Sequence, residues 1–205
     1  MRHKPFDLTA HRSSCAHCLG RLMVAKSDSI SFEAKVLRPA QPGMDDSWAF
    51  LVLPRQASAL LPRRGRTSVV GTINGHPFQA TLEPDGQLSH WLRVDEPLRK
   101  AAGIEFGDVV KLQVSRAKSE FEPSVPVDLR NAIAACPQAT RAWESTTTIA
   151  RIDWVHWVES AKQAATRKSR VDTARKMLAS GKQRVCCFDP SGYYSKSFRS
   201  PEAEQ

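Results

Sequence analysis

Apolar residues in the first half of the chain fall in short runs, many of them alternating with polar residues as β-strands require. Two such runs, residues 68–73 and 77–82, flank Asn74-Gly75, a pair that favours a two-residue type I′ hairpin turn. A Pro- and Gly-containing turn at residues 83–86 then leads to a third strand over residues 87–94. This stretch predicts the centre of a small β-domain.

Further strands are expected on either side of this hairpin. Residues 32–36 alternate, and residues 48–53 (WAFLVL) form a continuous apolar run, typical of a strand that is buried on both faces. Residues 109–115 form the last strand. Asp95 and Gly103 are placed to begin and end a short helix before it, and residues 55–61 fit one or two helical turns. About six strands with two short helices predict a compact, closed β-barrel.

Beyond residue 126 the apolar spacing becomes helical. Asp128 is expected to cap a first helix and Pro137 to open a second. A broad apolar stripe follows over residues 149–161, and Thr166 is expected to cap a last helix that ends at Gly181. This half of the chain predicts a small all-α domain, so the fold class expected for the whole protein is α+β.

The same patterns divide the chain into five parts. We expect a flexible N-terminal extension at 1–30, the β-barrel at 31–117, a linker at 118–126, the helical domain at 127–183 and a flexible tail at 184–205. The aperiodic start leaves two candidates for the physiological first residue, Met1 and Met23.

Composition narrows the function classes. No apolar run approaches the roughly 20 residues that span a membrane, and no signal peptide is evident, so a cytoplasmic protein is expected. The five cysteines have no secreted-scaffold spacing and are expected to be reduced. Cys15 and Cys18 lack a second ligand pair at a suitable distance for zinc. We therefore predict neither a metal nor a cofactor.

The net charge of +9 is concentrated near the end of the helical part. Residues 162–184 carry eight Lys and Arg with Asp172 as the single acid. Such a segment either forms a solvated helix face or holds phosphate groups of a nucleic acid or an anionic surface. The candidate binding residues are Lys162, Arg167, Lys168, Arg170, Arg175 and Lys176.

No sequence motif for catalysis is present, and no catalytic residue is predicted. The histidines His76, His90 and His156 are isolated in the sequence, where a structural role is the usual one. Acidic residues in or beside the turns, such as Glu83 and Asp85, are expected to serve local backbone hydrogen bonds. A non-enzymatic protein is therefore expected, with an enzyme acting on a small metabolite as an alternative.

Several residues of the first half share the spacing of a known family. The set comprises Trp48, Pro54, Gly71, Asn74, Gly75, Arg99, Gly103, Gly107 and Asp108. Over residues 31–116 it resembles the bacterial domain of unknown function that commonly precedes a YdeI/OmpD-associated domain. The resemblance implies a double-split β-barrel, the shape of the AbrB/MazE class of transcription factors and antitoxins.

The second half carries a resemblance of its own. The sequence VPVDL at 125–129, followed by Trp154, Trp157, Arg167 and Arg170, is similar to the YdeI/OmpD-associated, bacteriocin-protection domain. The chain departs from that family at residues 186–188, where Cys-Cys-Phe replaces a Lys- and Arg-rich end. The resemblance implies a role in resistance to bacteriocins or antimicrobial peptides by binding an unknown protein partner. A nucleic-acid-binding regulator that uses the basic helix is the main alternative.

Overall fold

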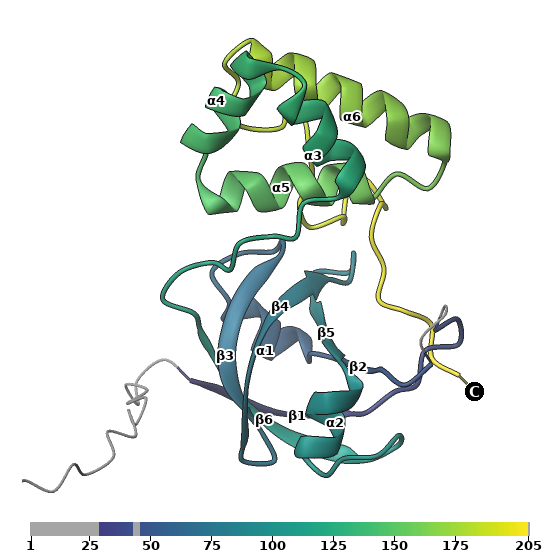
Figure 1. Cartoon of the computed structure of the whole chain (residues 1–205). Helices are drawn as coiled ribbons and strands as arrows, with labels where there is room; N and C mark the ends of the chain where they lie inside the picture. Colours follow the sequence, from purple (N-terminus) through teal and green to yellow (C-terminus); the bar gives the residue numbers. More distant parts are fainter. Residues whose placement is uncertain (1–28, 43–45, 205) are drawn as a thin grey trace, which may run out of the picture.

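The structure, a computed structural model, describes residues 29–42 and 46–204 of the chain and has an α+β architecture (Figure 1). The predictions for Cys15, Cys18 and Met23 lie outside these residues. An antiparallel sheet is followed in the chain by a group of helices that lies at one end of it (Figure 1). The strands are β1 Ile30–Lys35, β2 Ala49–Val52, β3 Thr67–Ile73, β4 His76–Pro84, β5 His90–Val94 and β6 Val109–Arg116.

The six-stranded sheet is a curled half-barrel in the order β1-β6-β3-β4-β5-β2. The end strands β1 and β2 approach each other through a single bridge between Leu37 and Phe50. Because β2 has four residues and Pro39 has no N–H to continue a ladder, this bridge does not grow into a strand pair. The prediction of a closed barrel is therefore wrong, and the barrel is open.

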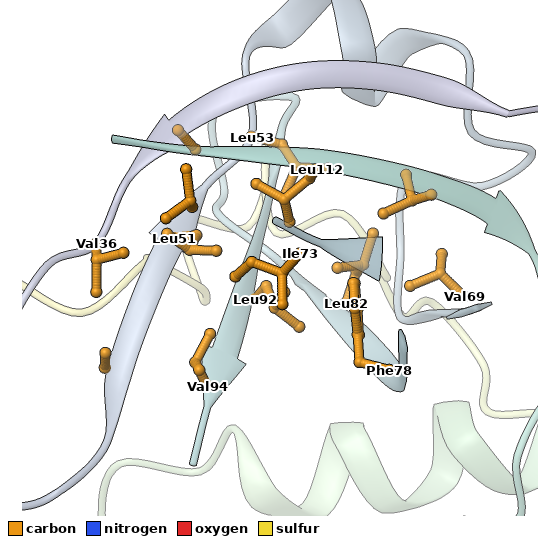
Figure 2. Close-up of a cluster of buried hydrophobic side chains, with 14 of the residues drawn as sticks. Val36, Leu51, Leu53, Val69, Ile73, Phe78, Leu82, Leu92, Val94 and Leu112 are labelled. Atoms are coloured by element: carbon orange, nitrogen blue, oxygen red, sulfur yellow. The ribbon is translucent and has the colours of Figure 1, made fainter. Parts of the chain in front are cut away.

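The concave side of the sheet is filled by side chains from alternate strand positions. Ile73, Leu82, Leu92 and Leu112 are each almost fully buried and converge on one interior cluster, to which Leu51 of β2 also belongs (Figure 2). Two short helices, α1 Arg55–Ala59 and α2 Glu96–Ala101, connect the strands. The α2 cap is as predicted, because the Asp95 carboxylate accepts a hydrogen bond from the Leu98 amide at 3.0 Å.

The turns around β4 confirm one prediction and correct another. Ile73 pairs with His76 across Asn74 and Gly75, whose φ angles of 47° and 85° match a type I′ hairpin. The next strand begins at His90 rather than at residue 87. Leu88 has a φ of 69°, which is a turn conformation, and the preceding carboxylate of Asp85 accepts amide hydrogen bonds within the turn.

Four helices follow, α3 Val127–Ala134, α4 Pro137–Ser145, α5 Thr148–Glu159 and α6 Ala164–Ala179. They share a buried cluster that includes Leu129, Trp154, Val158 and Leu178. Two predicted caps are wrong. Asp128 and Thr166 lie inside the first turns, because α3 begins after Pro126 and α6 after Gln163.

The C-terminal residues return along the sheet. The sequence predicts a flexible tail here; in the structure the chain beyond α6 passes the turn between β4 and β5, where Phe198 lies against Gly86, and reaches the loop after β1 (yellow in Figure 1). There the Ala40 amide donates to the Glu202 carbonyl at 2.8 Å, and the Glu204 amide donates to the Arg38 carbonyl at 2.9 Å. Within the described stretches, no helix combines the length and apolar character that crossing a bilayer requires.

Candidate binding site

Arg66, the residue before β3, joins the sheet to helix α5. Its Nε donates to Oε2 of Glu83 on β4 at 2.8 Å, and its Nη2 donates to Oε2 of Glu159 at 2.9 Å. Glu159 is the last residue of α5, so a single guanidinium is shared by two carboxylates from different parts of the fold. The three side chains are 17%, 24% and 36% exposed, which places the cluster between the surface and the interior.

A second arginine of the same loop makes a parallel connection. Nη2 of Arg63 donates to Oδ1 of Asp153 in α5 at 3.0 Å. Burial raises the pKa of Asp153, while the neighbouring Arg63 acts to lower it. The loop between α1 and β3 is thus held to α5 by two ion pairs.

A cavity of about 240 Å³ opens beside the Arg66 cluster. Arg66, Glu83 and Glu159 line it, together with Glu122 of the segment between β6 and α3. The rest of its wall is mainly apolar. The larger apolar side chains are Phe121, Pro123, Ile152 and Val155.

The charges around the cavity leave a negative excess. Glu122 is paired with Arg151 at 3.2 Å, while Glu83 and Glu159 share Arg66, the one cation among the residues that line the cavity. Burial raises the pKa of Glu83, an effect that Arg66 only partly offsets and that repulsion from Glu159 reinforces. The site therefore contains one guanidinium for two carboxylates, an arrangement that favours a further cation.

His156 lies one helical turn before Glu159 and is covered by the C-terminal tail. Its ring stacks on Phe198 with a centroid distance of 4.0 Å, and Phe188 meets it edge-on at 5.6 Å. Burial lowers the pKa of His156 to about 3, and the cations Arg66 and Arg63 act in the same direction. The imidazole is thus neutral at physiological pH, with a structural role in holding the tail.

His90, by contrast, has hydrogen-bond partners on both ring nitrogens. Nδ1 lies 2.7 Å from the Ser58 hydroxyl and Nε2 lies 3.0 Å from the Gly65 carbonyl. Burial lowers its pKa as well. The expectation that this isolated histidine is structural agrees with these contacts.

The basic residues predicted as a binding face do not line the cavity, and several already have partners. Arg167 pairs with Asp128 at 2.7 Å, while Arg175 and Lys176 both pair with Asp172, at 2.8 and 2.7 Å. Three of the six predicted cations are therefore in ion pairs, although Arg175 and Lys176 share one carboxylate.

Of the remaining three, Arg170 donates to the Trp157 carbonyl and, at 2.7 Å, to the Ser160 hydroxyl. Lys162 and Lys168 are exposed, and in the part of the chain that the structure describes neither takes part in an ion pair. The six residues thus do not form one continuous patch of unpaired charge.

The residues that carry the first resemblance shape the sheet instead of the cavity. A Cβ added at Gly71 would overlap the carbonyl oxygen of Gln113, so this glycine permits the close approach of β3 and β6. Arg99 pairs with Glu105 at 2.6 Å, and Asp108 accepts from the Glu105 amide at 2.8 Å. The others lie at turns or element ends: Trp48, Pro54, Asn74, Gly75, Gly103 and Gly107.

Sequence reasoning did not find this site. Glu83 was expected to serve a local backbone hydrogen bond, and this prediction is wrong because its carboxylate pairs with Arg66. Asp85 does play that local role, accepting from the Gln87 amide at 2.7 Å. A pairing of Arg66 with Glu159, 93 positions away, leaves no local signal.

Comparison with known proteins agrees with the two halves of the fold. No curated protein matches the chain. Residues 32–114 match the family described as a domain of unknown function, DUF1905. Residues 122–181 match the family described as bacteriocin-protection, YdeI or OmpD-associated. The chain therefore carries a DUF1905 domain at residues 32–114, followed by a bacteriocin-protection, YdeI/OmpD-associated domain at residues 122–181.

Proposed function

We propose that this protein contributes to bacteriocin protection as a non-catalytic, cytoplasmic binding protein. In this proposal the cavity beside Arg66 takes a Lys or Arg side chain from a polypeptide partner. The observation that carries the proposal is the pairing of one guanidinium with two carboxylates, Glu83 and Glu159, at the wall of that cavity.

The size of the cavity favours a side chain over a whole metabolite. Its volume of about 240 Å³ is below the roughly 300 to 1,000 Å³ that is typical of small-molecule and cofactor pockets. The apolar side chains of Phe121, Ile152 and Val155 suit the methylene stem of a Lys or Arg, since such stems lie along apolar surface while the charged head seeks a polar partner.

The overall charge of the protein also constrains the partner. A net charge of +9 repels a strongly cationic molecule at long range. The favoured partner is therefore a neutral or acidic polypeptide that presents a single Lys or Arg to the cavity. The carboxylates of the cavity attract the single Lys or Arg of such a partner, while the net positive charge of the protein repels polycationic peptides. The two effects together let the protein discriminate between them.

A neutral, fluorescently labelled peptide with one central Arg tests the proposal, with a citrulline peptide of the same sequence as its control. Fluorescence anisotropy is expected to detect the Arg peptide and not the citrulline peptide. Glu159→Gln should weaken binding about tenfold, the equivalent of roughly 1.4 kcal/mol. Glu144→Gln, on the exposed side of α4, should leave it unchanged.

NMR locates the binding event. Methyl resonances of Ile152 and Val155 should shift when the Arg peptide is added, because both side chains line the cavity. Equal affinity for the two peptides, or shifts confined to the surface of α6, would contradict the proposal. The latter pattern would instead direct attention to the basic helix and its nucleic-acid alternative.

A further inference from the structure

Cys186 and Cys187 are adjacent in the sequence, exposed, and close enough for their sulfurs to touch. Their Sγ atoms are 3.3 Å apart. Side chains of neighbouring residues in an extended chain point to opposite sides. Here Cys187 has a φ of 57°, a left-handed conformation that costs an ordinary residue about 1 to 2 kcal/mol and turns the two sulfurs toward each other.

The pair lies where the chain leaves α6 and enters the tail. Phe188, the next residue, packs against His156 and Phe198. A sulfur–sulfur bond is about 2.05 Å long, so the two atoms need to approach by only about 1.3 Å to form one. No rearrangement of distant parts of the fold is required.

We propose that Cys186 and Cys187 are a reversible redox site that forms a disulfide between adjacent residues on reaction with a low-molecular-weight disulfide such as oxidised glutathione. The thiolate of one cysteine attacks a sulfur of oxidised glutathione, forms a mixed disulfide and releases one reduced glutathione. The neighbouring thiolate then attacks the protein sulfur of that mixed disulfide and releases the second. The protein loses two electrons and two protons, which the two glutathione thiols carry away.

Each of the two thiols affects the ionisation of the other. The hydrogen bond with Cys186 and the charge of its thiolate both raise the pKa of Cys187. Because only the thiolate reacts, either cysteine can attack first, and its neighbour then resolves the mixed disulfide.

The covalent geometry of neighbours makes the bond easy to reduce. Consecutive Cα atoms lie about 3.8 Å apart, below the 4.4 to 6.8 Å of ordinary disulfides. A strained and exposed disulfide belongs to the labile class that is used for regulation or catalysis, and not to the structural class. The state of the pair thus follows the thiol–disulfide balance of its surroundings.

The experiment uses the full chain with Cys15→Ser, Cys18→Ser and Cys136→Ser, so that the pair supplies the only thiols. This protein is treated with oxidised glutathione and then assayed by intact mass, thiol titration and non-reducing gel electrophoresis. We expect a monomer that has lost two titratable thiols and the mass of two hydrogen atoms. Reduced glutathione should restore both thiols.

Variants in the same background test the resolving step. With Cys187→Ser, the glutathione adduct on Cys186 should last at least about ten times longer than in the parent, because no neighbouring thiol displaces it. In Cys186→Ser the adduct on Cys187 should be equally long-lived, because this variant also lacks the neighbouring thiol. A stable glutathione adduct on the parent, or oxidation that yields only covalent dimers, would overturn the proposal.

Discussion

Arg66 and Glu159 lie 93 positions apart in the sequence, yet Nη2 of the arginine donates to Oε2 of the glutamate over 2.9 Å. The same guanidinium also binds Glu83, so it couples the start of β3, the end of β4 and the end of α5. Burial opposes the charge on Arg66, but the two carboxylates outweigh this and raise its pKa. The arginine is therefore fully ionised, and the contact of β3 and β4 with α5, which we call the junction, depends on it.

Removal of that charge should destabilise the protein. Arg66→Met leaves the half-buried carboxylate of Glu83 without its cation. We expect this to lower the free energy of unfolding by about 2 kcal/mol at pH 7.5. This value is below the roughly 3 to 5 kcal/mol of fully buried pairs, because these side chains are partly exposed. The loss should be smaller at pH 5 than at pH 7.5, because burial raises the pKa of Glu83 and the variant lacks the cation that acts to lower it. Urea denaturation of parent and variant at both pH values measures it.

Two further variants make the interpretation specific. Arg64→Met removes an exposed cation from the same loop and should change the free energy of unfolding by less than about 0.5 kcal/mol. Adding Glu83→Gln to Arg66→Met should recover part of the loss. If Arg66→Met were as stable as Arg64→Met, the guanidinium would not hold the junction together.

Gly71 should be far less tolerant than Gly75, although both are glycines of the same hairpin. Ala at position 71 would place a methyl group on the Gln113 carbonyl and force β3 away from β6, with an expected cost of about 3 kcal/mol or more. Ala at position 75 meets open space, and its φ of 85° costs about 1 kcal/mol. Comparable urea midpoints for the two variants would show that the strands separate easily.

Local signals explain which elements were predictable from the sequence. The hairpin at Asn74-Gly75 and the cap at Asp95 depend on residues within three positions of each other, so the pattern alone is sufficient. The caps predicted at Asp128 and Thr166 failed because a capping residue type does not fix where a helix begins. In α3, Pro126 precedes the first turn and Asp128 turns outward to pair with Arg167.

The features that could not be predicted from the sequence depend on contacts between residues that are far apart in the chain. Closure of the barrel depended on whether the first and last strands of the sheet, β1 and β2, would pair, and the alternation of apolar residues within each strand does not specify its partner. The cavity is formed by residues from β4, the segment after β6 and α5, and only the three-dimensional fold brings them together. The path of the tail likewise depends on Phe198 finding His156, a contact that a Ser- and Gly-containing composition does not reveal.

His156 should make the stability of the protein depend on acid. Its pKa is about 3 in the folded state and about 6.5 when the chain is unfolded, so below pH 6.5 the unfolded state binds a proton that the folded state excludes. Stability is thus full above pH 6.5 and falls as the pH drops from there toward 3. The variant His156→Phe keeps an aromatic ring beside Phe198 but has no group to titrate. When the pH falls from 7.5 to 5, its free energy of unfolding should decrease by about 2 kcal/mol less than that of the parent.

Urea denaturation across this pH range measures the difference, and NMR checks its origin. The ring resonances of His156 in the folded parent should not titrate between pH 7.5 and pH 5. A titration near pH 6.5, or parallel pH profiles for parent and variant, would show that the tail does not exclude water from the imidazole.

Phe198 should be the residue that fixes the tail. Its ring stacks on His156 and also contacts Phe188, so Phe198→Ala removes the centre of this aromatic cluster. The expected loss is about 2 kcal/mol, below the roughly 3 to 5 kcal/mol of a fully buried Phe because Phe198 is only partly buried.

The pKa of His156 should rise toward 6.5 in the same variant, because water then reaches the ring. Tyr194→Ala is the matched control: this tail residue is 84% exposed, so its truncation should change stability by less than about 0.5 kcal/mol and leave His156 unaffected. Urea denaturation and a histidine NMR titration of both variants separate the two outcomes. Equal behaviour of Phe198→Ala and Tyr194→Ala would mean that the tail is flexible in solution, as its composition predicts, and that helix α5 buries His156 without it.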